Sequence, residues 1–344
     1  MNINFSSLHH IDVASNNIEE ITLDVSQEDL SKYIEELVDE IVYNPSKRNY
    51  KFKDASTQVK SSLFKILENN QDLKSIIEQN NKRLLEKESQ SQQSLASKNL
   101  DVVIQKGSLL HLSFEHEGEP YKKIILCKVE HDEILEEIKF NKIRGLNTRK
   151  KVFKAIFIVF NGDNTIHSSH VYDKNNSKYW WDGFLELTQV YTDSHNTSTS
   201  LDEVDKVLNR LKKKYPLDHL FIRNGMIAYY RSNENLDYSD FLKQVVEPYT
   251  PYNKEFPINK LHTTLVDLSK TDKFDTQFIV DKNSITKRMV NKIYLGNNLS
   301  LSIDAPNDNL DKIILPSEDI NGSKGIKIIS EEGYEQLKYL IPKE

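Results

Sequence analysis

The chain has 344 residues, of which 28% are charged and 38% are hydrophobic, and its formal net charge is -6. This composition is typical of a globular protein, and the length is enough for two domains with a substantial core. The acidic balance argues against the uniformly basic surface of a histone-like protein, although a local basic patch can still bind DNA because charges act over ~8–10 Å.

We expect no targeting signal in this sequence. No apolar run approaches the ~20 residues of a membrane-spanning helix, and the N-terminus lacks the basic start and apolar core of a signal peptide. The single cysteine, Cys127, lies in a strand-like run, where a buried structural thiol is expected rather than a nucleophile. We therefore expect a bacterial cytoplasmic protein without disulfides.

Residues 1–173 are predicted to form an α+β domain built on an antiparallel sheet with helices. An amphipathic helix follows Ser26, which we expect to cap it with Asp29 as the box partner, and it ends before Pro45. A longer helix is expected over about 56–96. The expected strands form three hairpins: 5–25 with its turn at 15–17, 109–114 with 121–129, and 152–160 with 165–172.

Residues 174–344 are predicted to form a second domain, mainly helical and ending in a small β-rich part. One helix is expected to begin at Pro257, since proline is tolerated in the first turn of a helix. The remaining expected helices are 179–190, 199–214 and 238–247, and the expected short strands are 276–281, 291–296, 299–304 and 324–329.

The two tryptophans of the chain lie side by side in the second domain. Trp180, Phe184 and Leu187 have the spacing i, i+4, i+7, and Trp181 with Leu185 forms a second apolar stripe. A helix that is apolar around so much of its circumference is usually clamped between other elements. The motif therefore predicts a core helix.

Catalytic motifs are not evident. The sequence has no glycine-rich phosphate loop and no nucleophile elbow, which predicts no functional nucleotide site and no cofactor. His167 and His170 are three residues apart on a predicted strand and so face opposite sides, which does not suit a metal site. An incomplete nuclease pattern remains open in the hairpin that carries Glu115, Lys128 and Glu130, where carboxylates could hold Mg²⁺.

Basic residues form three clusters in this acidic chain, and clustered cations are what phosphate backbones require. The first cluster comprises Lys142, Arg144, Arg149, Lys150, Lys151 and Lys154. The second comprises Lys206, Arg210, Lys212, Lys213 and Lys214, on a predicted helix, and the third comprises Lys287, Arg288 and Lys292. We predict that the first and third clusters bind nucleic acid.

Several stretches resemble the bacterial nucleoid-associated NdpA/YejK family. They include the opening Leu8–Val13 hairpin, the block from Ser108 to Glu130, and the motif from Trp181 to Leu185 followed by Asn196 and Thr197. Phe256-Pro257 and Lys287-Arg288 also fit this likeness, while the tryptophan pair and the Lys-rich 142–154 segment are typical of a divergent branch.

The resemblance implies a non-enzymatic, nucleoid-located protein, with a homodimer as a further possibility. Together with the basic clusters, it predicts binding of double-stranded DNA without sequence preference. Two alternatives stay open: a recruitment or sensor subunit of a phage or plasmid defence system, which would bind another DNA-processing or defence protein, and the metal-dependent nuclease. No membrane partner is expected.

Overall fold

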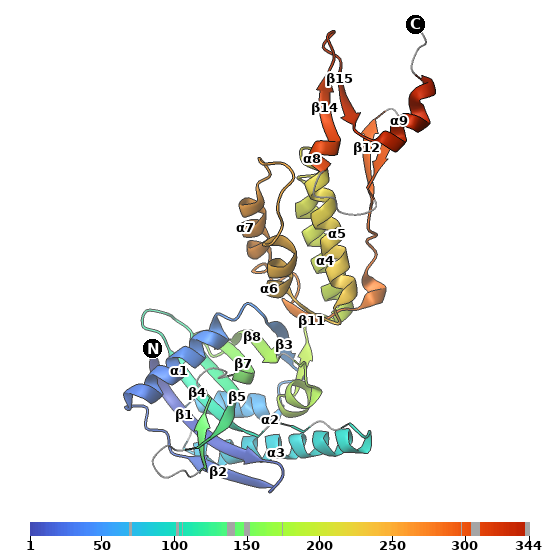
Figure 1. Ribbon diagram of the computed structural model, residues 1–344. Helices are drawn as coiled ribbons and strands as arrows, with labels where there is room; N and C mark the ends of the chain where they lie inside the picture. The colour runs from blue at the N-terminus through green and yellow to red at the C-terminus, as the bar shows by residue number, and fades with distance from the viewer. Residues whose placement is uncertain are drawn as a thin grey trace.

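The computed structural model shows three parts stacked along one direction (Figure 1). A β-sheet with helices is followed by a helical part, and two small hairpins with a terminal helix lie farthest from the sheet. The structure describes residues 1–68, 71–100, 103–104, 106–135, 142–147, 152–173, 175–296, 298–303 and 310–340. The predicted α+β class is confirmed, with its N-terminal antiparallel sheet, helical region and small C-terminal strands.

Within the described residues, nine strands form the large sheet, and all neighbouring strands are antiparallel. They are β1 (Asn2–Asp12), β2 (Asn17–Ile21), β3 (Arg48–Phe52), β4 (Gly107–Glu115), β5 (Lys122–Leu135), β6 (Lys142–Leu146), β7 (Val152–Phe160), β8 (Ile166–Asp173) and β9 (Leu187–Gln189). Their order is β2-β1-β4-β5-β7-β8-β3-β9, and β6 pairs with the end of β5. The three predicted hairpins are confirmed as β1–β2, β4–β5 and β7–β8.

Helices cover both faces of the sheet because its central strands are apolar on both sides. On one face, α1 (Glu28–Val42) buries Leu37 against a cluster that includes Leu110 and Cys127. On the other face, α2 (Gln58–Leu67) and α3 (Leu73–Ser97) pack on a cluster that includes Leu109 and Leu126. Cys127 is therefore buried as predicted, and burial raises the pKa of its thiol.

Two local predictions in this part are wrong. The helix expected over 56–96 is two helices, because α2 ends at Leu67 and α3 begins at Leu73. Ser26 does not cap α1, since its hydroxyl donates to the Asp24 carboxylate (2.5 Å) and Gln27 occupies the N-cap position. A short side chain that bonds its own neighbouring turn is not free to cap the helix.

The tryptophan motif packs against the sheet, as a π-helix and not as the predicted α-helix over 179–190. This helix, η1 (Tyr179–Phe184), is separated from β9 by two residues, one of which, Glu186, has φ 56°. Arg83 of α3 donates to the carbonyl groups of Gly183 (2.7 Å) and Phe184 (2.9 Å), which satisfies the helix end. The predicted burial of Trp180 and Phe184 is confirmed. The domain boundary after residue 173 stays a prediction.

The helical part has its own core, shared by α4 (Asp193–Asn209), α5 (Pro216–Ser232) and α7 (Ile258–Leu268). A short helix α6 (Tyr238–Phe241) continues as the π-helix η2 (Leu242–Val246), and β10 (Asn235–Asp237) pairs with β11 (Gln277–Ile279). Helix α4 begins earlier than predicted because the Thr192 side chain accepts from the His195 N–H (3.1 Å). Helix α5 was not predicted.

The C-terminal part consists of small elements that bury little. They are the 3-10 turn η3 (Lys282–Ser284), β12 (Lys292–Gly296), β13 (Leu299–Ser302), α8 (Leu310–Ile313), β14 (Ile314–Glu318), β15 (Lys324–Ile328), α9 (Glu331–Leu337) and the 3-10 turn η4 (Lys338–Leu340). The strands form two separate hairpins, β12–β13 and β14–β15. None of the residues described between 281 and 340 is buried. Across the described chain, no helix combines the length and apolar character needed to cross a membrane.

Candidate nucleic-acid interface

The third basic cluster is held against α5 by side chains of that helix. Segment 287–290 runs from the helical part towards β12. Three side chains of α5 donate hydrogen bonds to backbone carbonyl groups of this segment. Arg231 donates to Lys287 (3.1 Å) and Arg223 to Arg288 (2.9 Å). Asn224 donates to Val290 (2.5 Å). The Asn224 side chain also accepts from the Val290 N–H (3.0 Å). The segment is therefore fixed in place, and the Arg288 side chain is left exposed.

A groove of about 900 Å³ lies where this segment enters β12 beside α5 and the turn that follows α4. We call it the cationic groove. Its lining residues are Asp205, Asn209, Lys212, Lys213, Pro216, His219, Leu220, Arg223, Val290, Lys292, Ile293, Tyr294 and Leu295. The groove thus brings Lys292 of the third basic cluster to the same recess as Lys212 and Lys213 of the second.

Ion pairing divides the cations of this region into two groups. Arg223 binds Asp205 (2.6 Å), and Lys287 binds Asp202 (2.8 Å), so both are already neutralised by carboxylates. Lys212, Lys213 and Lys292 are exposed and form no ion pair within the described residues. They leave the groove with an uncompensated positive charge.

Histidine adds nothing to this charge at neutral pH. His219 lines the cationic groove, and its imidazole bonds the Asn209 side chain (3.1 Å). Burial, with a smaller contribution from nearby cations, lowers the pKa of His219 to about 4. The groove therefore owes its positive charge to its lysines.

The first basic cluster is described only in part. Lys142 and Arg144 lie on β6, opposite Leu135 and Glu133 of β5. Arg149, Lys150 and Lys151 lie outside the described residues. The structure corrects the prediction for Lys154, whose side chain is 1% exposed and donates to Asp173 (2.7 Å). A buried lysine with a carboxylate partner is not available to a DNA phosphate.

Comparison with known proteins assigns a family. The model of the family described as nucleoid-associated protein YejK matches residues 7–322. The chain belongs to this family. No curated protein matches the chain. The match to the YejK family covers the sheet, the helical part and the segment with Lys287, Arg288 and Lys292, so the resemblance found in the sequence is confirmed. The protein is therefore nucleoid-associated.

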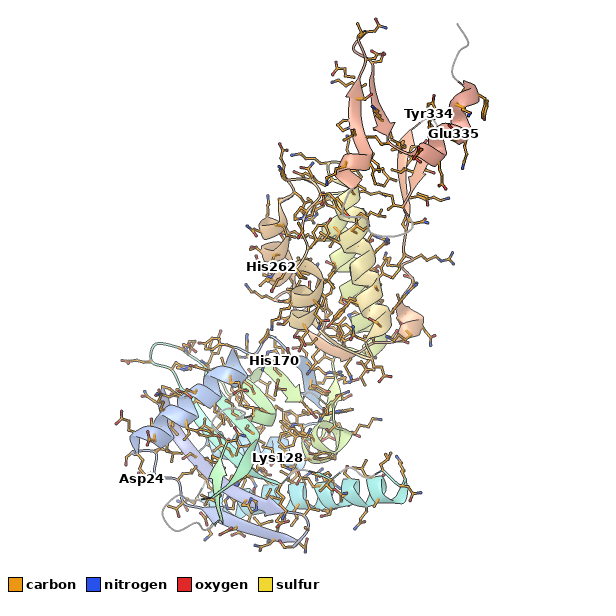
Figure 2. All side chains as sticks on the ribbon, in the orientation of Figure 1. Asp24, Lys128, His170, His262, Tyr334 and Glu335 are labelled. Atoms are coloured by element: carbon orange, nitrogen blue, oxygen red, sulfur yellow. The ribbon has the colours of Figure 1, made fainter. Side chains whose placement is uncertain are left out.

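In this member of the YejK family, the hairpin does not assemble the nuclease pattern. Glu115 lies opposite Lys122, whereas Lys128 lies opposite Leu109, so they are six positions apart on the hairpin, roughly 20 Å. Lys128, labelled in Figure 2, is also buried, and its ammonium is paired with Glu88 of α3. The side chain of Glu130 is outside the described part. Glu115 and Lys128 therefore cannot act on one metal ion.

His167 and His170 of β8 both line one cavity, and the pairing of β8 with β7 is irregular at His167, so their placement on opposite sides of a regular strand stays a prediction. Among the described residues, no group of three or more His, Cys, Asp or Glu side chains is placed to hold a metal ion. The YejK-family match says nothing of a cofactor.

The sequence analysis missed the helix that organises the cationic groove. Helix α5 supplies Arg223 and Asn224, which position the segment before β12. Its signal is present in the sequence, because Pro216 stands at the first helical position and Ile222, Met226 and Tyr230 follow at i, i+4, i+8. Proximity of Lys213 to Lys292 has no such signal, since 79 positions separate them.

Proposed function

We propose that this nucleoid-associated protein binds double-stranded DNA without sequence preference and does so through the cationic groove. The observation that carries the proposal is the convergence at one recess of Lys212, Lys213 and Lys292, all exposed and without carboxylate partners in the described part of the chain. Each phosphate that a lysine neutralises releases condensed counterions, which gives favourable binding to any duplex. Membership of the YejK family supports the same role.

The position of these lysines favours contacts with phosphates over contacts with base edges. Lys212 and Lys213 lie in the turn between α4 and α5, and Lys292 begins a strand. Sequence readout in the major groove usually requires a helix or a β-ribbon inserted along its length. Phosphate contacts position a protein on DNA without sensing sequence. We therefore infer a non-enzymatic binding role.

Salt dependence tests the proposal. We expect Lys212→Glu, Lys213→Glu and Lys292→Glu together to weaken binding to all duplexes by at least about tenfold at low salt. Loss of three phosphate contacts should also make the log–log salt slope less steep by about 2–3, because each contact contributes roughly -0.9. The measurement is fluorescence anisotropy with two labelled duplexes of unrelated sequence, titrated over a series of salt concentrations.

A matched control has the same charge change elsewhere. Lys32, Lys82 and Lys260 are exposed on α1, α3 and α7 and form no ion pair within the described part of the chain. Their triple change to Glu should leave most of the affinity intact. Equal loss in both triple variants would show that net charge alone, and not the cationic groove, governs binding. No binding by the parent protein at low salt would overturn the proposal and favour a recruitment role.

The first basic cluster is tested separately. Changing Arg149, Lys150 and Lys151 to Glu should weaken binding to both duplexes alike if this segment contacts DNA, together with Lys142 and Arg144. Unchanged affinity at every salt concentration would remove the segment from the interface and leave the cationic groove as the site. A homodimer, or a DNA-processing or defence protein as partner, stays a prediction.

A further inference from the structure

A second recess lies between the sheet and the helical part. Within the described residues, β3 pairs with β8 only at Arg48 and Asn49 before it continues beside β9. At this divergence the structure has a cavity of about 1040 Å³, and His170 lies where the two parts meet (Figure 2). We call it the inter-lobe cavity. Its lining includes Tyr43, Lys47, Lys51, Lys60, Ser169, His170, Tyr191, Lys270 and Asp272.

Hydrogen bonds between the two parts fix the walls of the inter-lobe cavity. The backbone of Lys47 donates to the Thr276 hydroxyl (2.9 Å), and the Thr276 N–H donates back to the Lys47 carbonyl (3.1 Å). The next contact joins the Asn49 N–H to the Asp275 carboxylate (2.8 Å). Because these bonds flank the lining residues, the cavity is preformed, which lowers the cost of binding a ligand.

The lining carries a surplus of positive charge. Lys47, Lys51 and Lys60 form no ion pair within the described residues. Lys270 is partly neutralised by Asp267 (2.9 Å), and Asp272 is the one carboxylate among the lining residues. Three uncompensated lysines around one recess suit an anionic ligand, and phosphate is the anion that such clusters commonly bind.

Two buried polar groups at this cavity have no partner among the described residues. Ser169 is 7% exposed, and its hydroxyl makes no hydrogen bond. Nδ1 of His170, the next residue of β8, is also unpaired. Burial is the largest cause that lowers the pKa of His170 to about 4, so its ring is neutral at pH 7. Leaving a polar atom buried without a partner is unfavourable.

Aromatic rings complete the lining. Tyr43 is 76% exposed, so its ring is open to a ligand. Tyr191 is fixed, because it stacks on His195 (4.8 Å between ring centroids) and donates its hydroxyl to the Asp272 carbonyl (2.5 Å). Nucleic-acid bases stack on such rings whatever their sequence. The cavity thus offers lysines for a phosphate and an exposed ring for a base.

We propose that the inter-lobe cavity binds a nucleotide unit, with the phosphate at Lys47, Lys51 and Lys60 and the base on Tyr43. The unit can come from an unpaired nucleic-acid strand or from a free nucleotide. A recess of this volume suits a small ligand, whereas an intact duplex needs a surface along its backbone. This site needs no glycine-rich loop, because its donors come from segments that meet only in the folded chain. It is separate from the cationic groove.

Binding of short labelled oligothymidylate, measured by anisotropy at low salt, tests the site. We expect Lys47→Gln with Lys51→Gln to weaken it by about tenfold, and Tyr43→Ala by a similar factor through lost stacking. Unlabelled ATP tests the free-nucleotide source by competition, and inorganic phosphate tests the anion alone. Competition by ATP would identify a free nucleotide as a ligand, and failure to compete would identify the strand. Either result supports the site if the cavity variants lose oligothymidylate.

Controls separate this site from the cationic groove. Lys32→Gln with Lys82→Gln removes the same charge from exposed positions and should leave oligothymidylate binding unchanged. Duplex binding should survive the cavity variants, while the triple change at the cationic groove should spare oligothymidylate. No binding of oligothymidylate or ATP by the parent overturns the inference even if duplex DNA binds. Unchanged binding by Tyr43→Ala, with phosphate competing as well as ATP, would reduce the site to a simple anion site and overturn the nucleotide assignment.

Discussion

Replacing Trp180 with Ala should lower the free energy of unfolding of the sheet part by about 3–5 kcal/mol. Trp180 is fully buried between the sheet and α3, and its ring lies 5.1 Å from the ring of Phe184. Truncation removes the largest apolar side chain of this cluster and leaves a cavity, because close-packed neighbours relax only partly. Urea unfolding followed by circular dichroism measures the change.

The Trp180→Phe variant is the matched control. The indole N–H of Trp180 has no hydrogen-bond partner within the described residues, so phenylalanine loses no polar contact that the structure shows. Its ring fills much of the same volume, and we expect a smaller loss than for alanine. An unfolding midpoint for Trp180→Ala equal to that of the parent would contradict the buried position of this side chain.

Breaking the buried ion pair between Lys154 and Asp173 should be about as costly, at roughly 3–5 kcal/mol for Lys154→Met. The two side chains are 1% and 3% exposed, and the Lys154 ammonium also donates to the Ser177 hydroxyl (2.7 Å). Methionine would leave the Asp173 carboxylate buried without its cation. Asp173 also accepts a hydrogen bond from the Ser177 N–H (2.6 Å), so a shift of its carboxylate would also disturb the residues just before η1.

The surroundings of this pair explain why its loss is expected to be severe. Lys154 lies directly opposite Lys128 on the neighbouring strand, and like charges in that arrangement repel. The carboxylates of Glu88 and Asp173 offset this repulsion, one for each lysine. Burial lowers the pKa of Lys154 and raises the pKa of Glu88, and the opposite charge of Asp173 or Lys128 opposes each shift.

A double-mutant cycle isolates the pair. Asp173→Asn keeps an acceptor for the Ser177 N–H but removes the charge, so Lys154→Met with Asp173→Asn should recover much of the stability lost by Lys154→Met alone. The measurement is the urea midpoint of the parent, both single variants and the double variant. Additive losses, with no recovery, would mean that the two charges do not depend on each other.

Local periodicity was sufficient to predict most of the elements. The i, i+4, i+7 pattern of α1, the alternation of the hairpins and the position of Pro257 before α7 each act over a few residues, so they appear in the chain itself. The same reasoning failed at residues 179–190. There, Arg83 of α3 donates to the carbonyl group at the end of η1, and Glu186 takes a positive φ. Neither feature follows from the neighbouring sequence.

The candidate site was likewise only partly predictable from the sequence. The sequence alone determined that basic residues gather in clusters and that the chain resembles the YejK family. Only the tertiary structure decided which lysines remain at the surface. Lys154 is buried because its strand position faces α3 and Asp173. Lys292 stays exposed in the cationic groove, which Lys213 also lines. The physical reason is that the availability of a charge depends on burial and on partners distant in sequence, which no local pattern records.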